Sequence, residues 1–491
     1  MHEPYSLPLA DTARLLIEGG DGRITPDKIS GVNRYGCRAT PYPELLSFAS
    51  ATATVISTHA YAAADTLRTH LQQALASSAA ETVYKRELQR MRNELLALCT
   101  RQDLPEPEVI FAASGTDLHH IAAQLGHAAD APGLTVLMVD QSETGSGVFA
   151  SISYADPSIK IATIALRHSD GAARTPKQID AEFSLLANQA QRQGRQILLI
   201  QTDVSKTGMI APSYACTASL SQQFGGGIDV LIDACQFRIS PLTLHACLAR
   251  GYNVALTGSK FVGGPSFSGA LLIPQQSMAR IRQRYANATP LRHNTHVSDI
   301  WQAHYVDSSS WGMILRWEAA FCELRAFRNV PTVDVSNFMH RFSVAIQNRL
   351  HDDPSFTPIG IPTLQRNGLR DLPDWDDIPS IFPFKVRGSA MQLLNETQLA
   401  QLYRQLPYGP TPCQLAQPVG CGNTKDALRL CLSAHQIVAG CQSSAHAEQL
   451  IAQAYLVLDQ VALLASKLHH EVDTVTQLEQ SIESGYTTIR T

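Results

Sequence analysis

DVLIDACQFRISPLTLHACLARGYNVALTGSKFVGGPSFSGALLIP, residues 229–274, is the stretch of this chain that decides its fold. Its pattern predicts a buried strand ending at Asp233, a helix, a second strand over residues 253–256 and a third strand before Pro274. A carboxylate at the carboxyl end of a parallel strand lies where open α/β sheets bind ligands. The second strand leads to Lys260 between hydroxyl and glycine residues, where hydroxyls can hold a phosphate and the amine can form an imine. The stretch therefore predicts an α/β fold with a ligand site that contains Asp233 and Lys260.

These residues resemble those of the pyridoxal 5′-phosphate (PLP) enzymes of fold type I, in particular the class V aminotransferase and cysteine desulfurase group. The resemblance implies that Asp233 pairs with the pyridinium nitrogen of PLP, Gln236 contacts its phenolic oxygen and Lys260 forms the Schiff base. PLP needs such an anionic partner to keep its ring nitrogen protonated. The alternative is an ordinary βαβ unit with a surface lysine and a buried, capped acid.

The implied fold is a large domain, built on a mixed, mostly parallel seven-stranded sheet, with a smaller α+β C-terminal domain. We expect an N-terminal arm and helices over residues 1–105, the PLP-binding domain over 106–310, and linking helices with the small domain over 311–491. The first 55 residues read as irregular, and such an arm often packs on the small domain or on a partner subunit in this fold. Periodicity and breakers predict the other elements: strands over residues 108–112, 134–139, 160–166, 197–200, 381–386 and 427–432, and helices over 60–100, 178–192, 311–327, 335–350, 391–406 and 445–469.

Composition limits the class of protein. The chain has 491 residues and a net charge of −4, so no basic field points to a nucleic-acid partner. Its ten cysteines lack the paired spacing of zinc sites, which agrees with a reducing compartment and no bound metal. We find no basic segment followed by an apolar core at the start and no run of 18 apolar residues. We therefore expect a soluble cytoplasmic protein without a membrane partner.

A phosphate cradle is predicted at Ser114-Gly115-Thr116, between a strand and a helix, because free backbone N–H groups and the helix dipole favour an anion there. The alternative, that Ser114 or Thr116 caps the helix, is compatible with this role. The resemblance implies that Thr257 and Ser259 also contact the cofactor, and it places Ser205 where relatives carry an asparagine near the ring. Thr295 matches a threonine that reaches the phosphate of the neighbouring subunit, which implies a homodimer with the active site at its interface.

Two further residues are candidates for substrate binding. The resemblance assigns Arg429 to the substrate α-carboxylate, because a bidentate guanidinium fixes the Cα bonds relative to the ring; the alternative is an arginine on the outer face of its strand. Glu143 and Thr144 replace the aromatic ring or histidine that usually stacks on PLP. Glu143 is a candidate substrate contact or acid–base group, and a solvated loop carboxylate is the alternative. His119 and His120 are adjacent on a helix and point in different directions, which disfavours a shared metal.

The reaction is expected to be transamination of a small amino acid or amine. The alternative is a desulfurase-like or other β-lyase reaction, because the segment CQLAQP at residues 413–418 resembles one that carries the nucleophilic cysteine of some desulfurases. Cys413 would be that nucleophile, although no base stands beside it in the sequence and a structural thiol is the simpler explanation. A third possibility is a non-catalytic subunit with the PLP fold.

Overall fold

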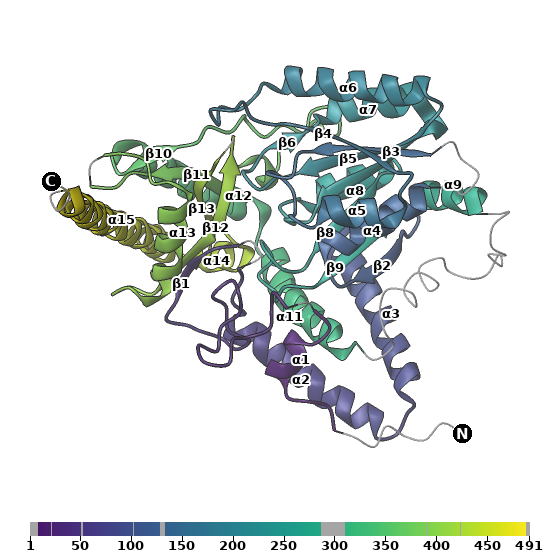
Figure 1. Cartoon of the computed structure of the whole chain (residues 1–491). Coiled ribbons are helices and arrows are strands. Elements are labelled where there is room, and N and C mark those ends of the chain that lie inside the picture. The colour runs from purple at the N-terminus through teal and green to yellow at the C-terminus, as the bar shows by residue number, and fades with distance from the viewer. Residues whose placement is uncertain are drawn as a thin grey trace.

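The computed structural model describes residues 8–20, 22–50, 53–101, 103–127, 133–285, 310–389, 391–422 and 424–487, with side chains of the last helix described to residue 468. Within these ranges the chain forms a large α/β unit around one sheet and a smaller unit around a second sheet, with long helices between and below them (Figure 1).

The large sheet has the strand order β2-β9-β8-β7-β5-β3-β4, and a two-residue strand, β6, pairs with β5. All neighbours on this path are parallel except the pairs made by β9, so the predicted mostly parallel sheet of seven strands is confirmed. Its strands are β2 (Glu108–Ala112), β3 (Leu134–Val139), β4 (Lys160–Ile164), β5 (Gln196–Asp203), β6 (Ile210–Ala211), β7 (Ile228–Ala234), β8 (Asn253–Thr257) and β9 (Gly269–Ile273). The register pairs Thr202 with Asp233 and Asp233 with Ala255, which places these residues at one carboxyl edge.

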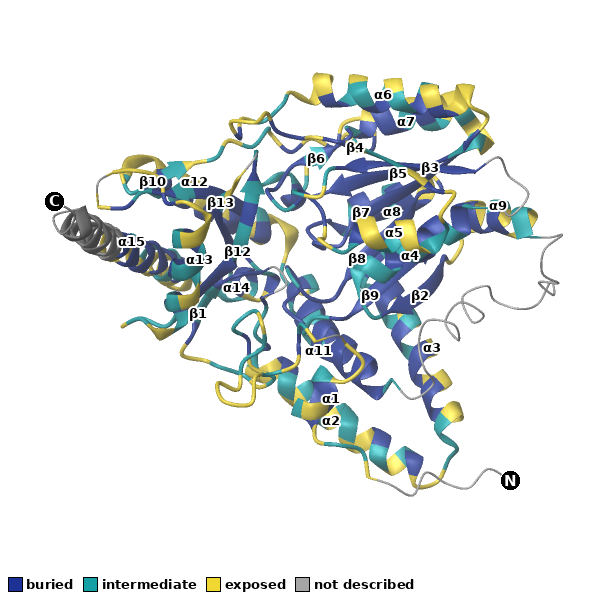
Figure 2. Ribbon diagram, viewed as in Figure 1, coloured by how far each residue is buried: buried dark blue, intermediate teal, exposed yellow. Residues whose placement is uncertain are grey.

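Helices cover both faces of this sheet, because its central strands are apolar on both sides. One face packs on α4 (Gly115–Gly126), α5 (Val148–Ala155) and α9 (Gln275–Tyr285). The other packs on α6 (Pro176–Arg192), α7 (Tyr214–Phe224) and α8 (Pro241–Ala249). Figure 2 shows the strands buried and the outer side of α6 exposed.

A set of long helices joins the two units. These are α2 (Thr58–Leu75), α3 (Ala80–Cys99), α11 (Trp311–Arg328) and α12 (Thr332–Asp352). Helix α11 is buried on nearly all sides, including its charged residues Arg316, Glu318 and Glu323. It packs against α2, α3 and α14 (Ala434–Gly440) and carries the buried Trp317. The predicted connecting helices are confirmed with small shifts at their ends.

The small sheet has the order β1-β12-β13-β11-β10 and is antiparallel except for the pair β1 and β12. Its strands are β1 (Leu46–Phe48), β10 (Phe356–Pro358), β11 (Ile381–Val386), β12 (Cys413–Cys421) and β13 (Thr424–Cys431). The prediction that the first 55 residues are irregular is wrong in part. They contain α1 (Thr12–Ile17) and β1, and β1 attaches this arm to the small sheet.

Two C-terminal helices differ from their predicted bounds. Helix α13 spans Glu396–Gln405 rather than starting at residue 391, because Asn395 caps it through the backbone N–H of Gln398. Helix α15 spans Ser444–Thr487, and by length and composition its part Ser444–Leu468 could cross a membrane. A buried stripe on this part, which includes Ala454, Val457 and Leu458, packs within the protein against α12, α13 and α14. Packing in the core therefore accounts for part of its apolar composition, because 44% of the most apolar window is buried.

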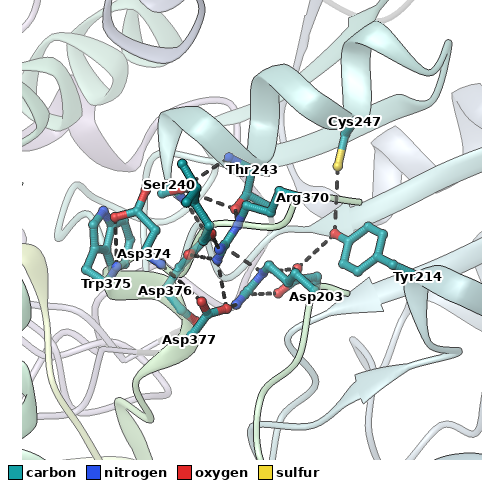
Figure 3. Close-up of polar contacts among 12 residues, drawn as sticks. Asp203, Tyr214, Ser240, Thr243, Cys247, Arg370, Asp374, Trp375, Asp376 and Asp377 are labelled. Carbon is teal, nitrogen blue, oxygen red and sulfur yellow. Dashed lines mark hydrogen bonds and ion pairs between the residues drawn. The ribbon is translucent and has the colours of Figure 1, made fainter. Parts of the chain in front are cut away.

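A buried ion-pair network fixes residues 364–377, which connect two small-sheet strands, against the large unit (Figure 3). The guanidinium of Arg366 binds both carboxylate oxygens of Asp203, at 2.6 and 2.9 Å, and Tyr214 donates to the same carboxylate at 2.8 Å. Arg370 binds Asp376 and Asp377, each at 2.7 Å. Because Asp203 is the last residue of β5, the network holds the connecting segment against the edge of the large sheet where the candidate site lies.

Candidate active site

A cavity of about 590 Å³ lies at the carboxyl edge of the large sheet, with strands β12 and β13 of the small sheet contributing to its wall. Most of the residues predicted from the sequence meet in this wall: Ser114, Gly115, Thr116, Glu143, Asp233, Gln236, Thr257, Ser259, Lys260 and Arg429. They come from segments far apart in the chain, and the parallel strand order brings them together at one edge.

Asp233 forms an ion pair with a histidine that the sequence did not assign. His119 Nε2 lies 3.3 Å from Asp233 Oδ2, and its Nδ1 lies 2.6 Å from the carbonyl oxygen of Gly115. That carbonyl can accept a hydrogen bond only from Nδ1–H, so the ring is protonated on Nδ1. When the ring is charged, Nε2 also carries a proton and faces Asp233. Burial raises the cost of charge on both groups, but their mutual attraction outweighs it: the pKa of Asp233 is lowered and that of His119 is raised. The pair keeps the carboxylate ionised inside the protein.

Lys260 lies in a tight turn that follows β8. Its φ angle is 58°, in the left-handed region that residues with a side chain rarely adopt. Such strain persists where the surrounding structure imposes it, which is frequent at functional sites. Here the turn is held by the bond from the Gly264 N–H to the Gly258 carbonyl, at 3.0 Å. A Cβ on Gly264 would lie 2.7 Å from that carbonyl oxygen, so this position requires glycine.

The turn Ser114-Gly115-Thr116 begins helix α4 and faces the cavity. Ser114 caps the helix in a capping box with Asp117, as the alternative from the sequence proposed. A Cβ on Gly115 would lie 2.9 Å from the sulfur of Cys235 in the neighbouring wall, so glycine brings the backbone close to the sheet edge. The helix begins at the cavity, which is also the arrangement that binds anions.

Two oxygen atoms in the wall are buried without a partner among the described residues. They are Oγ1 of Thr202, whose residue is 2% exposed, and Oε1 of Gln236, whose residue is 7% exposed. Buried polar atoms are rarely left unpaired in proteins, and because these two face the same cavity, a ligand bound there could pair with them.

Arg429, on β13, is 4% exposed and lines the cavity, so the alternative of an arginine on the outer face is wrong. Its Nη1 donates to the carbonyl of Lys206 and its Nη2 to the carbonyl of Gln417, both at 3.0 Å. Its Nε has no partner among the described residues. Burial lowers the pKa of this guanidinium. An anion in the cavity would relieve that cost.

The comparisons with known proteins bear on the fold of the chain. No protein-family model and no curated protein matches the sequence. Several solved structures are similar. The cystine C–S lyase C-DES, bound to its product cysteine persulfide, matches with 15% identity and a TM-score of 0.56 over 84% of this chain and 96% of its own.

Two aminotransferases match a similar share of this chain. The phosphoserine aminotransferase SerC of Cytophaga hutchinsonii has 12% identity and a TM-score of 0.52, over 84% of this chain and 98% of its own. The ureidoglycine–glyoxylate aminotransferase PucG of Bacillus subtilis has 10% identity and a TM-score of 0.53, over 88% of this chain and 99% of its own. The fold is that of the fold type I PLP-dependent enzymes.

The residues in the cavity fit the PLP that this fold type binds. Asp233 supplies a buried anion for the ring nitrogen, and the unpaired Gln236 Oε1 and Thr202 Oγ1 supply polar atoms that need partners. The start of α4 supplies an anion site, with hydroxyls of Thr257 and Ser259 in the same wall. The cavity wall therefore contains groups suited to the PLP ring and to its phosphate, and Lys260 supplies an amine for the covalent link.

Glu143 is not a solvated loop carboxylate, because its residue is 1% exposed. Its oxygens accept hydrogen bonds from Ser205 Oγ at 2.8 Å and Thr207 Oγ1 at 2.7 Å, and Arg167 Nε lies 3.2 Å away. Both oxygens are engaged, which argues against the predicted substrate contact. The hydroxyl of Ser205 is turned toward Glu143 and its residue is not part of the cavity wall, so the prediction that Ser205 contacts the cofactor or substrate is wrong. Thr144 lines the cavity, and its hydroxyl lies 3.5 Å from Asp233 Oδ2.

The structure argues against Cys413 as a nucleophile. It lies on β12 outside the cavity wall, it is completely buried, and its thiol points to the carbonyl of Leu406 at 3.8 Å. Burial raises the pKa of this thiol to about 12, which suppresses the reactive thiolate. Cys421, on the same strand, is also buried and its pKa is raised to about 11. Thr295 lies outside the described residues.

Three functional candidates were missed in the sequence. His119 follows Gly115 by one helical turn, so helical spacing alone places it on the same side of α4. Lys206 lies beside Ser205 in a segment that the resemblance already covers, and it lines the cavity. Arg23, from the N-terminal arm, reaches the wall as well, and no pattern in that irregular segment indicates this position.

Proposed function

We propose that this chain is a PLP-dependent enzyme that transaminates a small amino acid or amine. One observation carries the proposal: a strained lysine, a buried carboxylate paired with a histidine, and a buried arginine with a free Nε line the same cavity. A protein without chemistry has no need for this costly combination of buried charge and backbone strain.

When bound, PLP supplies an electron-accepting ring that stabilises negative charge at the substrate Cα. The residues of this chain then have separate tasks. Asp233, kept ionised by His119, holds a proton on the ring nitrogen. The start of α4, with Thr257 and Ser259, binds the phosphate. Lys260 would link the cofactor to the protein, and its amine would be placed to move the proton at the substrate Cα. Arg429 binds the α-carboxylate and orients the Cα bonds.

A C–S lyase reaction is the second candidate, because the similar structures include a cystine C–S lyase as well as aminotransferases. The burial of Cys413 argues against a reaction that passes sulfur to a protein thiol. Cys235 lines the cavity, but burial holds the pKa of its thiol well above the ordinary value, so we expect a lyase of this chain to release its sulfur product from the cavity directly.

The two reactions are separated by their products. PLP-loaded protein is incubated with a panel of amino acids, with and without a keto acid acceptor. Transamination predicts a new amino acid that forms only when the keto acid acceptor is present. A C–S lyase reaction predicts sulfide or persulfide from cystine when the acceptor is absent. Lys260→Ala is expected to abolish either reaction, whereas Lys177→Ala, at an exposed position on α6, leaves it unchanged. Absence of any product from a protein that binds PLP would contradict the proposal.

We also propose a cytoplasmic homodimer in which Thr295 reaches the phosphate site of the partner subunit. The ten free cysteines support a reducing compartment. Light scattering coupled to gel filtration is expected to give twice the mass of the chain. A monomer that binds PLP with full activity would contradict the shared site.

A further inference from the structure

The charged residues of the cavity wall are unbalanced. Its two acidic residues among the described wall residues are already paired, Asp233 with His119 and Glu143 with Arg167. Apart from Lys260, and from Arg23, which lies over the Phe267 ring, the wall contains the cationic residues Lys206, Lys425 and Arg429. One substrate α-carboxylate on Arg429 would neutralise only part of this charge.

Lys206 is the cation with the most informative surroundings. It lies between β5 and β6, where its backbone carbonyl accepts from Arg429 Nη1 at 3.0 Å and its backbone N–H donates to the Glu143 carbonyl at 2.9 Å. Its ammonium donates to the Gln141 carbonyl at 3.1 Å and forms no ion pair among the described residues. Lys206 is thus held beside the proposed carboxylate-binding arginine without an anion of its own.

A second cation, Lys425, also lines the cavity. Lys425, on β13 with Arg429, has a largely exposed side chain, and its nearest carboxylate partner, Glu396, is 3.9 Å away and exposed as well. An exposed pair at this distance contributes little. Lys425 is therefore available to an anion entering the cavity, as a weaker partner than Lys206.

We propose that the substrate carries a second acidic group, which Lys206 binds while Arg429 binds the α-carboxylate. This inference rests on the proposed function, because it concerns the substrate of the same cavity. The substrate class is an amino acid with a carboxylate or a phosphate-like group on its side chain. A lysine suits either group, since its ammonium is a compact charge with rotatable donors rather than a planar fork.

Electrostatics makes this class the favoured one. Like charges held together in a partly buried site oppose each other, and burial and Arg429 lower the pKa of Lys206 to about 8. An acidic group on Lys206, beside the α-carboxylate on Arg429, would offset that repulsion and add a charge-assisted hydrogen bond. A neutral side chain gains neither, so the site discriminates by charge as well as by shape.

The test uses calorimetry on PLP-loaded protein with ligands that lack an amine and so do not react. Succinate carries two carboxylates, succinamate has nearly the same shape with one neutral end, and 3-phosphonopropionate replaces one carboxylate by a phosphonate. We expect succinate or the phosphonate to bind at least ~10-fold more tightly than succinamate, and the preferred acid identifies the class. Lys206→Met should remove most of this preference with little effect on succinamate. Lys177→Met, on the surface of α6, should change neither affinity.

Equal affinities of wild-type protein for succinate and succinamate would overturn the inference, and this comparison needs no variant. An unchanged preference in Lys206→Met would overturn the role of that residue. The visible absorbance of bound PLP is recorded on every sample. If the band is present and the preference absent, only the inference fails; if wild-type protein shows no band, the proposed function fails and the inference with it.

Discussion

His119 and Asp233 show how a buried charge pair sets the chemistry of one residue. Asp233 stays ionised in a buried wall because His119 faces it and the backbone N–H of Cys235 donates to it at 3.1 Å. The sequence indicated Asp233 through its place at a strand end and through the resemblance. It did not indicate His119, because the partner of a buried acid depends on which helix crosses the sheet edge.

We predict that His119→Asn weakens PLP binding by ~10-fold and changes its pH dependence. Asparagine can still bond to the Gly115 carbonyl, but it cannot supply the positive charge, so the pKa of Asp233 rises. PLP binding requires ionised Asp233. As the pH is lowered, the variant should therefore lose PLP at a higher pH than the wild type does. Fluorescence titration with PLP at several pH values measures this shift. His120→Asn, whose ring contacts Ser151 instead, is the control, and an equal shift there would contradict the role of His119.

A second prediction concerns Lys206 and alkaline pH. The groups that influence it are Arg429 and Lys260, which lower its pKa, and Glu143 and Asp140, which raise it, while burial has the largest effect. Because Lys206 must be charged to bind an acid, affinity for succinate should fall as the pH rises through about 8. Calorimetry at pH values on both sides of that point measures the change. In Lys206→Met the decline should disappear, and a decline that persists there would assign it to another group.

At the scale of elements, the prediction succeeded where the local pattern is strong. The strands of the large sheet are short apolar runs that end in polar or glycine-rich turns, and β2, β3 and β11 have the predicted bounds. Strand β12 was missed because Gln417, Pro418 and Gly420 obscure any alternation. Strand β1 was missed because it is short and its partner, β12, lies far along the chain. The burial of Glu143 likewise depends on Arg167 and Thr207, which come from two other connections.

The turn after β8 gives a prediction for packing. Gly264→Ala would place a methyl group 2.8 Å from Cβ of Ala320 on α11, as well as against the Gly258 carbonyl. Neither contact can relax by rotating a flexible side chain. We expect a loss of about 1–3 kcal/mol in stability and weaker PLP binding, because Lys260 lies in the same turn. Thermal unfolding measures the first effect. Gly22→Ala, with open space around it, is the control and should have no effect; equal midpoints for the two variants would contradict this account.

At the scale of the whole molecule, the cavity exists because the two units are held together. The resemblance predicted a large and a small unit, but not the buried network that fixes residues 364–377 to β5, since its partners are separated by long stretches of chain (Figure 3). The resemblance left open whether the N-terminal arm packs on the small unit or on a partner subunit. Its strand β1 joins the small sheet, and its Arg23 and Tyr35 line the cavity.

The network predicts that replacing Arg366 strongly lowers the stability of the protein. Arg366→Met removes one partner of a fully buried pair and leaves the charge of Asp203 uncompensated. Such a change costs about 3–5 kcal/mol, so the urea midpoint should fall substantially. Arg14→Met breaks an exposed pair on one helical turn and serves as the control. A midpoint for Arg366→Met as high as that of the control would show that the network does not hold the units together.

The central claim is that Lys260 binds PLP within this cavity. The most direct test is to load the protein with PLP, reduce it with borohydride and identify the modified peptide by mass spectrometry. We predict one modified site, Lys260, and none in Lys260→Ala. Lys206 is the informative competitor, because it lines the same cavity and its pKa is lowered to about 8. Modification of Lys206 instead, or of no lysine in the cavity, would contradict the account.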